Sequence, residues 1–274
     1  MLARVTAAFG PPGQGDTMAI HPTAIVAAGA EIDGSVEVGP YAVIGPRVRI
    51  GAGTSVGPHA VIEGNTTIGR GNRIFQFASL GAIPQDLKFE GEETRLEIGD
   101  ENQIREFVTM HVGTAGGGGL TRVGNKSLFM AYSHVAHDCQ IGDGCILANC
   151  GTLGGHAVLE DHVIVGGLAG VHQFVRLGRH AFVAAGSLVT QDVPPYCTVQ
   201  GDRAKLSGLN TVGLSRAGYT KEQMARVKAA YKTVFRTTLG LREAIAQVRA
   251  EHGGNPEIDH FLAFLEGSER GVAR

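Results

Sequence analysis

The segment VEVGPYAVIGPRVRIGAGTSVGPHAVIEGNTTIG, residues 36–69, decides the fold. An aliphatic residue recurs at every sixth position of this segment, and glycine often follows it directly. Outward from this segment, the same phase runs over residues 20–80, returns over 98–110, and returns again over 123–189. A period of six fits neither an α-helix nor a free-standing strand, but it is typical of short strands joined by turns.

The repeat predicts a mainly β fold, a parallel β-helix with three hexads per coil and roughly nine coils. We expect the aliphatic residue to point inward, the glycine to permit the tight turn, and the small residue four positions after the aliphatic one to fill a crowded corner. The predicted solenoid spans residues 20–202. External loops are expected near 82–97 and 113–122, where the phase is interrupted.

Different patterns flank the repeat. Residues 1–19 precede the first hexad and are predicted to be a disordered extension. Residues 203–274 are predicted to form an α-helical C-terminal domain, because Thr220 and Gln223 have capping-box spacing and apolar residues follow at helical intervals. A helical domain at this position would cover the last sheet edges.

Composition restricts the function. The 274 residues are 43% hydrophobic and 18% charged, with a net charge of −2, so the chain lacks the basic surface of a nucleic-acid binder. No apolar stretch is long enough for a transmembrane helix, which predicts no stable membrane insertion. The four cysteines form no C-x-x-C motif and no export signal is evident, so we expect reduced thiols and a cytoplasmic protein.

Histidines cluster in the second half of the repeat. Because a coil holds about 18 residues, His137 is expected beside Gly155-His156 one coil further on and near His172-Gln173 two coils on. His134 lies three residues before His137. This column of histidines in successive coils predicts a functional site, although the repeat does not say which reaction the site serves.

Three interpretations of the column compete. Imidazoles from neighbouring coils could bind Zn²⁺, one histidine could act as an acid or base, or the histidines could occupy solvent-facing turns. Asp138 follows His137 directly, and a strict 18-residue register aligns Gln173, rather than a third histidine, with His137. We therefore favour acid–base chemistry and expect neither metal nor cofactor. Solvent-facing turns are the interpretation that we favour for His59, His162 and His180.

Five motifs carry a resemblance to a known family: Gln85-Asp86-Leu87-Lys88, His134-Val135-Ala136-His137-Asp138-Cys139, Gly154-Gly155-His156, Val171-His172-Gln173-Phe174, and Gln191-Asp192-Val193-Pro194-Pro195-Tyr196. With the hexad repeat, they resemble the UDP-N-acetylglucosamine acyltransferases of lipid A biosynthesis over nearly the whole chain. The resemblance implies a left-handed β-helix, an exception to the usual right-handed crossover. It also implies a homotrimer with active sites between neighbouring subunits.

The resemblance also implies an activity. The family transfers a 3-hydroxyacyl chain from acyl carrier protein to the 3-hydroxyl of UDP-N-acetylglucosamine, which is the first step of lipid A biosynthesis. It implies that His137 is the general base, that Asp138 supports it, and that the Gly155 backbone N–H stabilises the oxyanion. For Gly155, the coil arithmetic independently predicts a place beside His137.

Substrate-binding and chain-length positions follow from the same resemblance. Val212 and Ala217 depart from residues that the family can carry near the nucleotide. Lys228, Lys232 and Arg236 share one helix face, which is either a docking site for acyl carrier protein or an ordinary solvated face. The implied substrate-binding residues are Asp86, Lys88, His134, His156, His172, Gln173, Asn210 and Arg216, and the implied acyl-length residues are Ala185 and Arg203.

Other functions remain alternatives. A related N-acyltransferase of the same pathway would carry an additional N-terminal domain, and a coenzyme A-dependent acetyltransferase would fit the loops and the His137-Asp138 motif less well. A γ-type carbonic anhydrase would hold a metal ion, and a catalytically silent scaffold would retain its function without His137.

Overall fold

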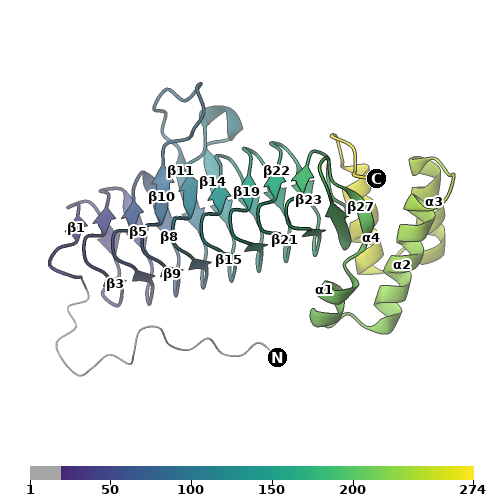
Figure 1. Ribbon diagram of the computed structural model, residues 1–274, viewed down its shortest axis with the longest axis horizontal. Helices are drawn as coiled ribbons and strands as arrows, with labels where there is room; N and C mark the ends of the chain where they lie inside the picture. Colours follow the sequence, from purple (N-terminus) through teal and green to yellow (C-terminus); the bar gives the residue numbers. More distant parts are fainter. Residues whose placement is uncertain (1–19) are drawn as a thin grey trace.

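The computed structural model of the chain describes residues 20–274, so the extension predicted at 1–19 lies outside the described residues. The described chain is a left-handed parallel β-helix followed by α-helices (Figure 1). The predicted fold class is therefore confirmed. Each coil contributes one short strand to each of three sheets, here named sheets I, II and III.

Sheet I has nine strands. They are, in spatial order, β1 (Ile25–Val26), β4 (Val43–Ile44), β7 (Val61–Ile62), β10 (Ser79–Ala82), β13 (Thr109–His111), β16 (His134–Val135), β19 (Thr152–Leu153), β22 (Gly170–Val171) and β25 (Leu188–Val189).

Sheet II has eight strands. They are β2 (Glu31–Ile32), β5 (Val48–Ile50), β8 (Asn65–Ile68), β11 (Arg95–Ile98), β14 (Leu120–Val123), β17 (Gln140–Ile141), β20 (Val158–Leu159) and β23 (Arg176–Leu177).

Sheet III has ten strands, and the last pair is antiparallel. From the C-terminal end they are β27 (Lys205–Leu209), β26 (Cys197–Gln200), β24 (Phe182–Val183), β21 (Ile164–Val165), β18 (Ile146–Leu147), β15 (Leu128–Phe129), β12 (Gln103–Ile104), β9 (Arg73–Ile74), β6 (Ser55–Val56) and β3 (Glu37–Val38).

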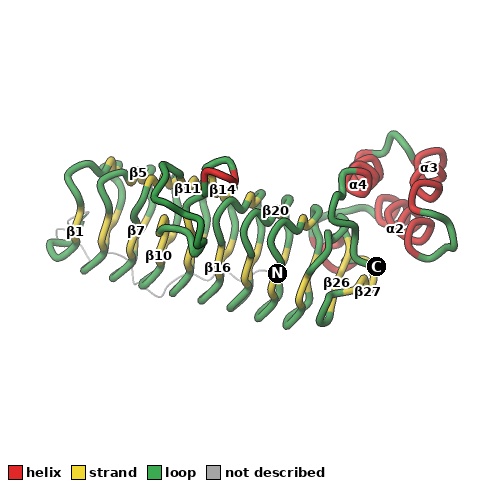
Figure 2. The backbone as a smooth tube through the Cα atoms, turned by 90° about the horizontal axis from the view of Figure 1, so that it is seen from above, coloured by secondary structure: helices red, strands yellow, loops and turns green. Residues whose placement is uncertain are grey.

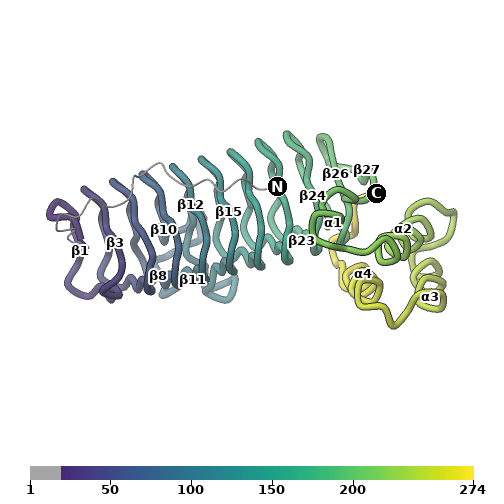
Figure 3. The backbone as a smooth tube through the Cα atoms, turned by 90° about the horizontal axis from the view of Figure 1, so that it is seen from below, coloured from purple at the N-terminus to yellow at the C-terminus, as the bar shows by residue number. Residues whose placement is uncertain are grey.

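The predicted coil register is confirmed. His134 pairs with Thr152, which lies 18 residues further along the chain, and Thr152 pairs with Gly170. The register is larger only where a loop is inserted, as between Arg73 and Gln103. The strands stack in a regular row (Figure 3), so residues at the same hexad position form columns along the molecule.

The tight turn differs from the prediction. The left-handed backbone position lies three residues after the inward aliphatic residue, and it is mostly occupied by residues other than glycine, such as Asp138 (φ 60°) after Val135. The glycine directly after the aliphatic residue serves another purpose. A Cβ on Gly154 would lie 2.7 Å from the backbone nitrogen of Gln173, so this glycine allows the next coil to approach closely.

The inward residues form one continuous core. Val135, Leu153 and Val171 are buried in successive coils, and the small corner residues Cys139 and Cys145 are fully buried as predicted. Burial raises the pKa of each of these two thiols to about 12, so they are unreactive packing groups. The four cysteines of the described chain are free.

The C-terminal region is not entirely helical, because β27 within the predicted range 203–274 pairs with β26 in a hairpin. The helices follow it and gather beyond the last coil (Figure 2). The predicted capping box of Thr220 and Gln223 begins α2. The helices are α1 (Thr211–Arg216), α2 (Lys221–Phe235), α3 (Leu241–His252) and α4 (Pro256–Glu266), and none in the described chain is long and apolar enough to cross a membrane.

Candidate active site

The three sheets form the sides of a triangular prism, and its corners are named after the sheets that meet there: I–II, II–III and III–I. The two predicted insertions emerge from the I–II corner, where the chain passes from sheet I to sheet II. The first joins β10 to β11 and the second joins β13 to β14, and both project from the same side of the stack (Figure 1). Their observed bounds, 83–94 and 112–119, are slightly narrower than predicted. The turn that carries His137 and Asp138 lies on this corner in the next coil, between β16 and β17.

His137 and Asp138 form a hydrogen-bonded pair. The His137 Nδ1 atom lies 2.8 Å from Asp138 Oδ2, and the side chains of the two residues are 15% and 1% exposed. A carboxylate at this distance favours the tautomer with the proton on Nδ1, which leaves the Nε2 lone pair free. The pair can therefore accept a proton at Nε2 while the carboxylate stabilises the imidazolium that forms.

The second insertion holds Asp138 in place. The Thr114 backbone N–H donates to Asp138 Oδ1 over 2.9 Å, and the Thr114 hydroxyl donates to Oδ2 over 2.7 Å. From the other side, the Asp138 N–H donates to the Thr121 hydroxyl over 2.7 Å. Sequence reasoning identified neither threonine as part of the site, because both lie where the hexad phase is broken.

Gly155 lies directly against the His137 ring, as the coil arithmetic predicts. A Cβ on Gly155 would be 2.6 Å from both Cε1 and Nε2 of His137, so the close contact requires glycine. The Gly155 N–H finds no acceptor among the described residues, although its carbonyl accepts from Phe174 N–H. A donor free of other partners beside the imidazole is suited to bind an oxygen of a reacting group.

His156 completes one wall of the site. Its ring stacks on Phe174 with centroids 4.3 Å apart and meets the His137 ring edge-on at 5.1 Å. Burial lowers the His156 pKa, opposed by attraction to the Asp138 carboxylate and, more weakly, to the Asp86 carboxylate of the first insertion. Asp86, predicted to bind substrate, therefore lies within electrostatic range of this wall.

His134 and a residue missed by the sequence analysis, His111, lie next to the turn that carries His137 and Asp138. Thr109 Oγ1 and His134 Nδ1 are 2.7 Å apart, and the His111 ring meets the His134 ring edge-on at 4.8 Å. Burial, with repulsion from His134 and His137, lowers the His111 pKa to about 4. His111 could have been found by lengthening the 18-residue register by the seven residues inserted in this coil, because the longer register aligns His111 with Ala136.

His137, Asp138 and His156 are also the one group among residues 20–274 whose ligand atoms could share a metal ion. The Asp138 carboxylate is already engaged by Thr114, and its contact with His137 has hydrogen-bond length. The geometry is accounted for by an acid–base pair.

Other predicted residues lie elsewhere on the chain. His172 and Gln173 are exposed on the I–II corner one coil beyond His156, and Lys88 is exposed on the first insertion. Asn210 caps α1 and donates to the His180 carbonyl on the II–III corner. Within one chain, Asn210 therefore lies on a different corner of the solenoid from His137. Arg216 is exposed at the end of α1, and the two acyl-length positions, Ala185 and Arg203, are also exposed.

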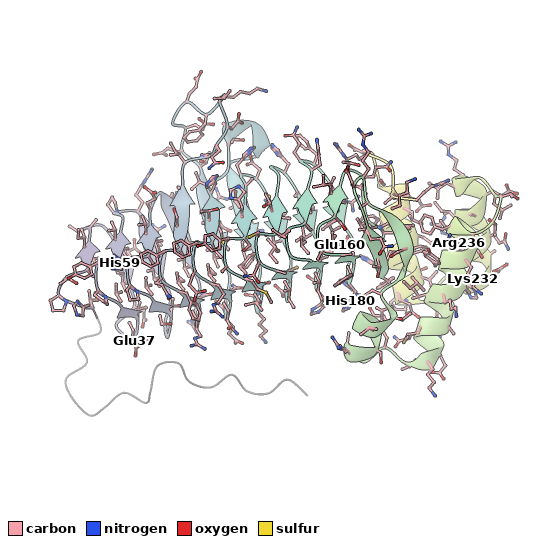
Figure 4. All side chains as sticks on the ribbon, in the orientation of Figure 1. Glu37, His59, Glu160, His180, Lys232 and Arg236 are labelled. Atoms are coloured by element: carbon pink, nitrogen blue, oxygen red, sulfur yellow. The ribbon has the colours of Figure 1, made fainter. Side chains whose placement is uncertain are left out.

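The prediction that His180 faces solvent is wrong. Its side chain is buried against Tyr196, which directly precedes β26, and Tyr219, which lies between α1 and α2. Burial is the main cause that lowers the His180 pKa to about 4. His59 and His162 are exposed, and Figure 4 labels His59 near the first coils and His180 near the helices.

Comparison with known proteins gives consistent matches. A family described as UDP N-acetylglucosamine O-acyltransferase, domain 2, matches residues 192–273, and the bacterial transferase hexapeptide model matches residues 120–155. The acyl-[acyl-carrier-protein]–UDP-N-acetylglucosamine O-acyltransferase of Anaeromyxobacter dehalogenans is 62% identical over 94% of this chain and 100% of the relative. The Myxococcus xanthus enzyme of that name is 60% identical over 93% of this chain and 99% of its own length.

Solved structures agree with these relatives. LpxA from Acinetobacter baumannii superimposes with a TM-score of 0.91 at 44% identity, covering 93% of this chain and 100% of that chain. The UDP-N-acetylglucosamine O-acyltransferase of Moraxella catarrhalis gives a TM-score of 0.91 at 43% identity, covering 94% and 100%. The chain therefore belongs to the acyl-[acyl-carrier-protein]–UDP-N-acetylglucosamine O-acyltransferase family, and it is an acyltransferase.

Proposed function

We propose that this acyltransferase moves a 3-hydroxyacyl chain from acyl carrier protein to the 3-hydroxyl of UDP-N-acetylglucosamine, the first step of lipid A biosynthesis, with His137 as general base. The observation that carries the proposal is the His137–Asp138 pair beside Gly155. We place the reaction in the cytoplasm, and the free cysteines of the described chain are compatible with that location.

The proposed step begins at His137. A sugar hydroxyl is a weak nucleophile at neutral pH, and the Nε2 lone pair removes its proton as the oxygen attacks the thioester carbonyl carbon. Asp138 holds the ring through Nδ1 and stabilises the imidazolium. The imidazolium then returns the proton to the departing thiolate, so the products are the sugar ester and the free thiol of the carrier protein.

The tetrahedral intermediate carries a negative oxygen that needs a donor. The unpartnered Gly155 N–H lies beside the base and is the donor that we propose. One such hydrogen bond contributes on the order of 10²–10³ in rate in other acyl-transfer enzymes. Asp86 and Lys88 of the first insertion and His134 lie around the same corner, and we propose that they contact the sugar.

We also propose that the protein works as a homotrimer, and the outer faces of the sheets support this. Sheet II faces outward with charged residues that form ion pairs, such as Arg49 with Glu31 and Arg122 with Glu97. Sheet I exposes no charged residue. Sheet III exposes Glu37 and Arg73 in its N-terminal half, but its C-terminal half carries half-buried apolar residues on the outer face, including Ile146 and Ile164. Sheets I and III are therefore the faces suited to burial between subunits.

The corner shared by these two faces has a ladder of exposed rings. The rings stack with centroids 4.7–5.2 Å apart, and we name this set the aromatic ladder: Tyr41, His59, Phe77, Phe107 and Tyr132. The exposed side chain of Leu168 continues the line beyond it. We propose that this III–I corner points toward the threefold axis, where the ladders of three subunits meet.

This packing would also complete the active site. When sheet I of one subunit faces sheet III of the next, the I–II corner of the first lies beside the II–III corner of the second. Asn210 and Arg216 of a neighbour would then approach His137, which they cannot do within one chain. The apolar outward residues of sheet III would line a groove for the acyl chain, with Ala185 and Arg203 near its end.

Acceptor specificity tests the proposal. We expect the purified protein to convert 3-hydroxyacyl carrier protein and UDP-N-acetylglucosamine into a product that gains one hydroxyacyl group by mass spectrometry and loses it on mild alkaline hydrolysis. A 3-amino analogue of the sugar nucleotide is the control, because its amide product would resist alkali. Transfer to the amine alone would contradict the proposed O-acyl transfer.

A further inference from the structure

The C-terminal segment, residues 268–274, returns from the helices to the I–II corner that carries the active site. Asp192, which is 1% exposed, anchors it: the Asp192 N–H donates to the Gly271 carbonyl over 3.0 Å, and Ala273 N–H donates to the Asp192 carbonyl over 2.8 Å. The Asp192 carboxylate also accepts from the Ser268 hydroxyl. Val272 and Ala273 are buried, so the segment has a fixed place beyond the last coil.

Arg270 of this segment reaches back across two coils. Its Nε donates to the Thr190 carbonyl over 2.8 Å, and its Nη2 lies 2.9 Å from His172 Nδ1. Thr190 lies one coil beyond His172, so a single guanidinium bridges the two coils. The hydrogen bond from Nε to the Thr190 carbonyl fixes the plane of the guanidinium and directs Nη2 at the His172 imidazole.

The contact restricts the tautomer of His172. A guanidinium offers only donors, so His172 Nδ1 must present its lone pair to Arg270. The Gln173 carbonyl lies 3.0 Å from the same Nδ1, but a carbonyl can only accept and would require a proton on that atom. The two contacts require opposite tautomers, and the one with the charged donor is the stronger.

We infer that Arg270 is a positioning residue that holds His172 in the tautomer with its proton on Nε2, so that His172 presents a hydrogen-bond donor to a substrate oxygen. Without Arg270, Nδ1–H would donate to the Gln173 carbonyl and Nε2 would become an acceptor, which repels a carbonyl, phosphate or hydroxyl oxygen lone pair. The part that concerns substrate rests on the proposed function, whereas the tautomer does not.

The test is made on the full-length enzyme with ¹⁵N-labelled histidine. The His172→Asn variant identifies the His172 signals. In wild type we expect Nδ1 to resonate as an unprotonated nitrogen and Nε2 as a protonated one, and in Arg270→Gln we expect the two assignments to exchange. Unchanged assignments in Arg270→Gln would overturn the inference, whatever the substrate proves to be.

Kinetics provide the second readout. Loss of one well-placed hydrogen bond predicts a KM about tenfold higher for the substrate that His172 contacts, with kcat changed less than about twofold. Arg270→Lys keeps a cationic donor and should recover most of the loss. Arg274→Gln, in the same segment, should behave as wild type. A KM in Arg270→Gln equal to that of wild type, or an equal loss in Arg274→Gln, would contradict a role in positioning His172.

Discussion

At the scale of single residues, the geometry of the site depends on a missing side chain at Gly155 and on the backbone conformation of Asp138. Gly155 leaves room for the His137 ring, and its N–H remains free of other partners. Asp138 adopts a left-handed backbone conformation, which aspartate tolerates better than most residues, and this turns its carboxylate back toward His137. The position of the His137 ring, the proposed base, is therefore set by two backbone features and one carboxylate.

Gly155→Ala should displace the base. The added Cβ would lie 2.6 Å from the His137 ring, so either the ring or the turn must move. We expect kcat to fall by roughly 10² or more, because the His137 ring and the proposed oxyanion donor, the Gly155 N–H, are disturbed together. Gly116→Ala in the second insertion is the control, since nothing lies within 4 Å of a Cβ there. Full activity in Gly155→Ala would contradict the site geometry.

Buried histidines should make the fold sensitive to acid. His111 and His180 each have a pKa lowered to about 4, against an ordinary value near 6.5, chiefly by burial. Between these values the unfolded chain binds more protons, so stability falls as the pH drops below about 6.5. At pH 5 each of these buried histidines should lower the free energy of unfolding by about 2 kcal/mol relative to pH 8.

Urea unfolding of wild type and His180→Asn at pH 8 and pH 5 measures this effect. Asparagine keeps a polar side chain but does not titrate in this range. The loss of stability between the two pH values should be smaller in the variant by about 2 kcal/mol. An equal loss in both proteins would show that His180 does not titrate as a buried group.

At the scale of elements, the alternation of each short strand decides which side chains enter the core. Thr67 and Ile68 are neighbours on β8, yet Thr67 is exposed and Ile68 is buried. The hexad phase fixes this alternation through every coil. An error of one residue in register would exchange the two faces.

Ile68→Asp should therefore destabilise the solenoid by about 4 kcal/mol or more, since it removes a buried aliphatic side chain and inserts a carboxylate without a partner. The adjacent Thr67→Asp should change stability by less than about 1 kcal/mol. Thermal melting followed by circular dichroism distinguishes the two variants. Equal melting temperatures would mean that the assigned inward phase is wrong.

The sequence was sufficient to predict the coils, and insufficient where the period breaks. Period six and the 18-residue register predicted the contact of Gly155 with His137, because columns follow from arithmetic alone. Thr114, which fixes Asp138, was missed because an insertion has no register of its own. Thr121 was missed because the hexad phase resumes only at Val123, although Thr121 already lies on β14. His180 was predicted incorrectly, because Tyr196 and Tyr219, which bury it, lie after the last hexad of the repeat.

At the scale of the whole molecule, the three outer faces of the solenoid differ in charge: sheet II carries ion-paired residues, sheet I exposes no charged residue, and sheet III exposes charged residues such as Glu37 and Arg73 in its N-terminal half. Ion pairs across neighbouring strands suit sheet II to water, whereas the aromatic ladder and sheets I and III lack such partners. The proposed trimer buries these surfaces and brings the II–III corner of one subunit to the I–II corner of the next. Assembly and catalysis are linked in this account.

Phe107→Asp should disrupt the trimer. Phe107 lies within the aromatic ladder, and aspartate tolerates its left-handed backbone conformation (φ 60°), so each chain should still fold. Light scattering after size-exclusion chromatography should show monomers or a concentration-dependent mixture, with transfer activity lost in proportion. Thr67→Asp on sheet II should remain trimeric. An intact, active trimer of Phe107→Asp would place the ladder outside the interface.

The base itself is the central claim, and the transfer rates of wild type and His137→Ala test it most directly. The assay uses 3-hydroxyacyl carrier protein and UDP-N-acetylglucosamine, with circular dichroism and light scattering to show that both proteins have the same fold and assembly. We predict transfer by wild type and a loss of at least about 10² in kcat for the variant. A correctly assembled His137→Ala protein that transfers at the wild-type rate would contradict the account.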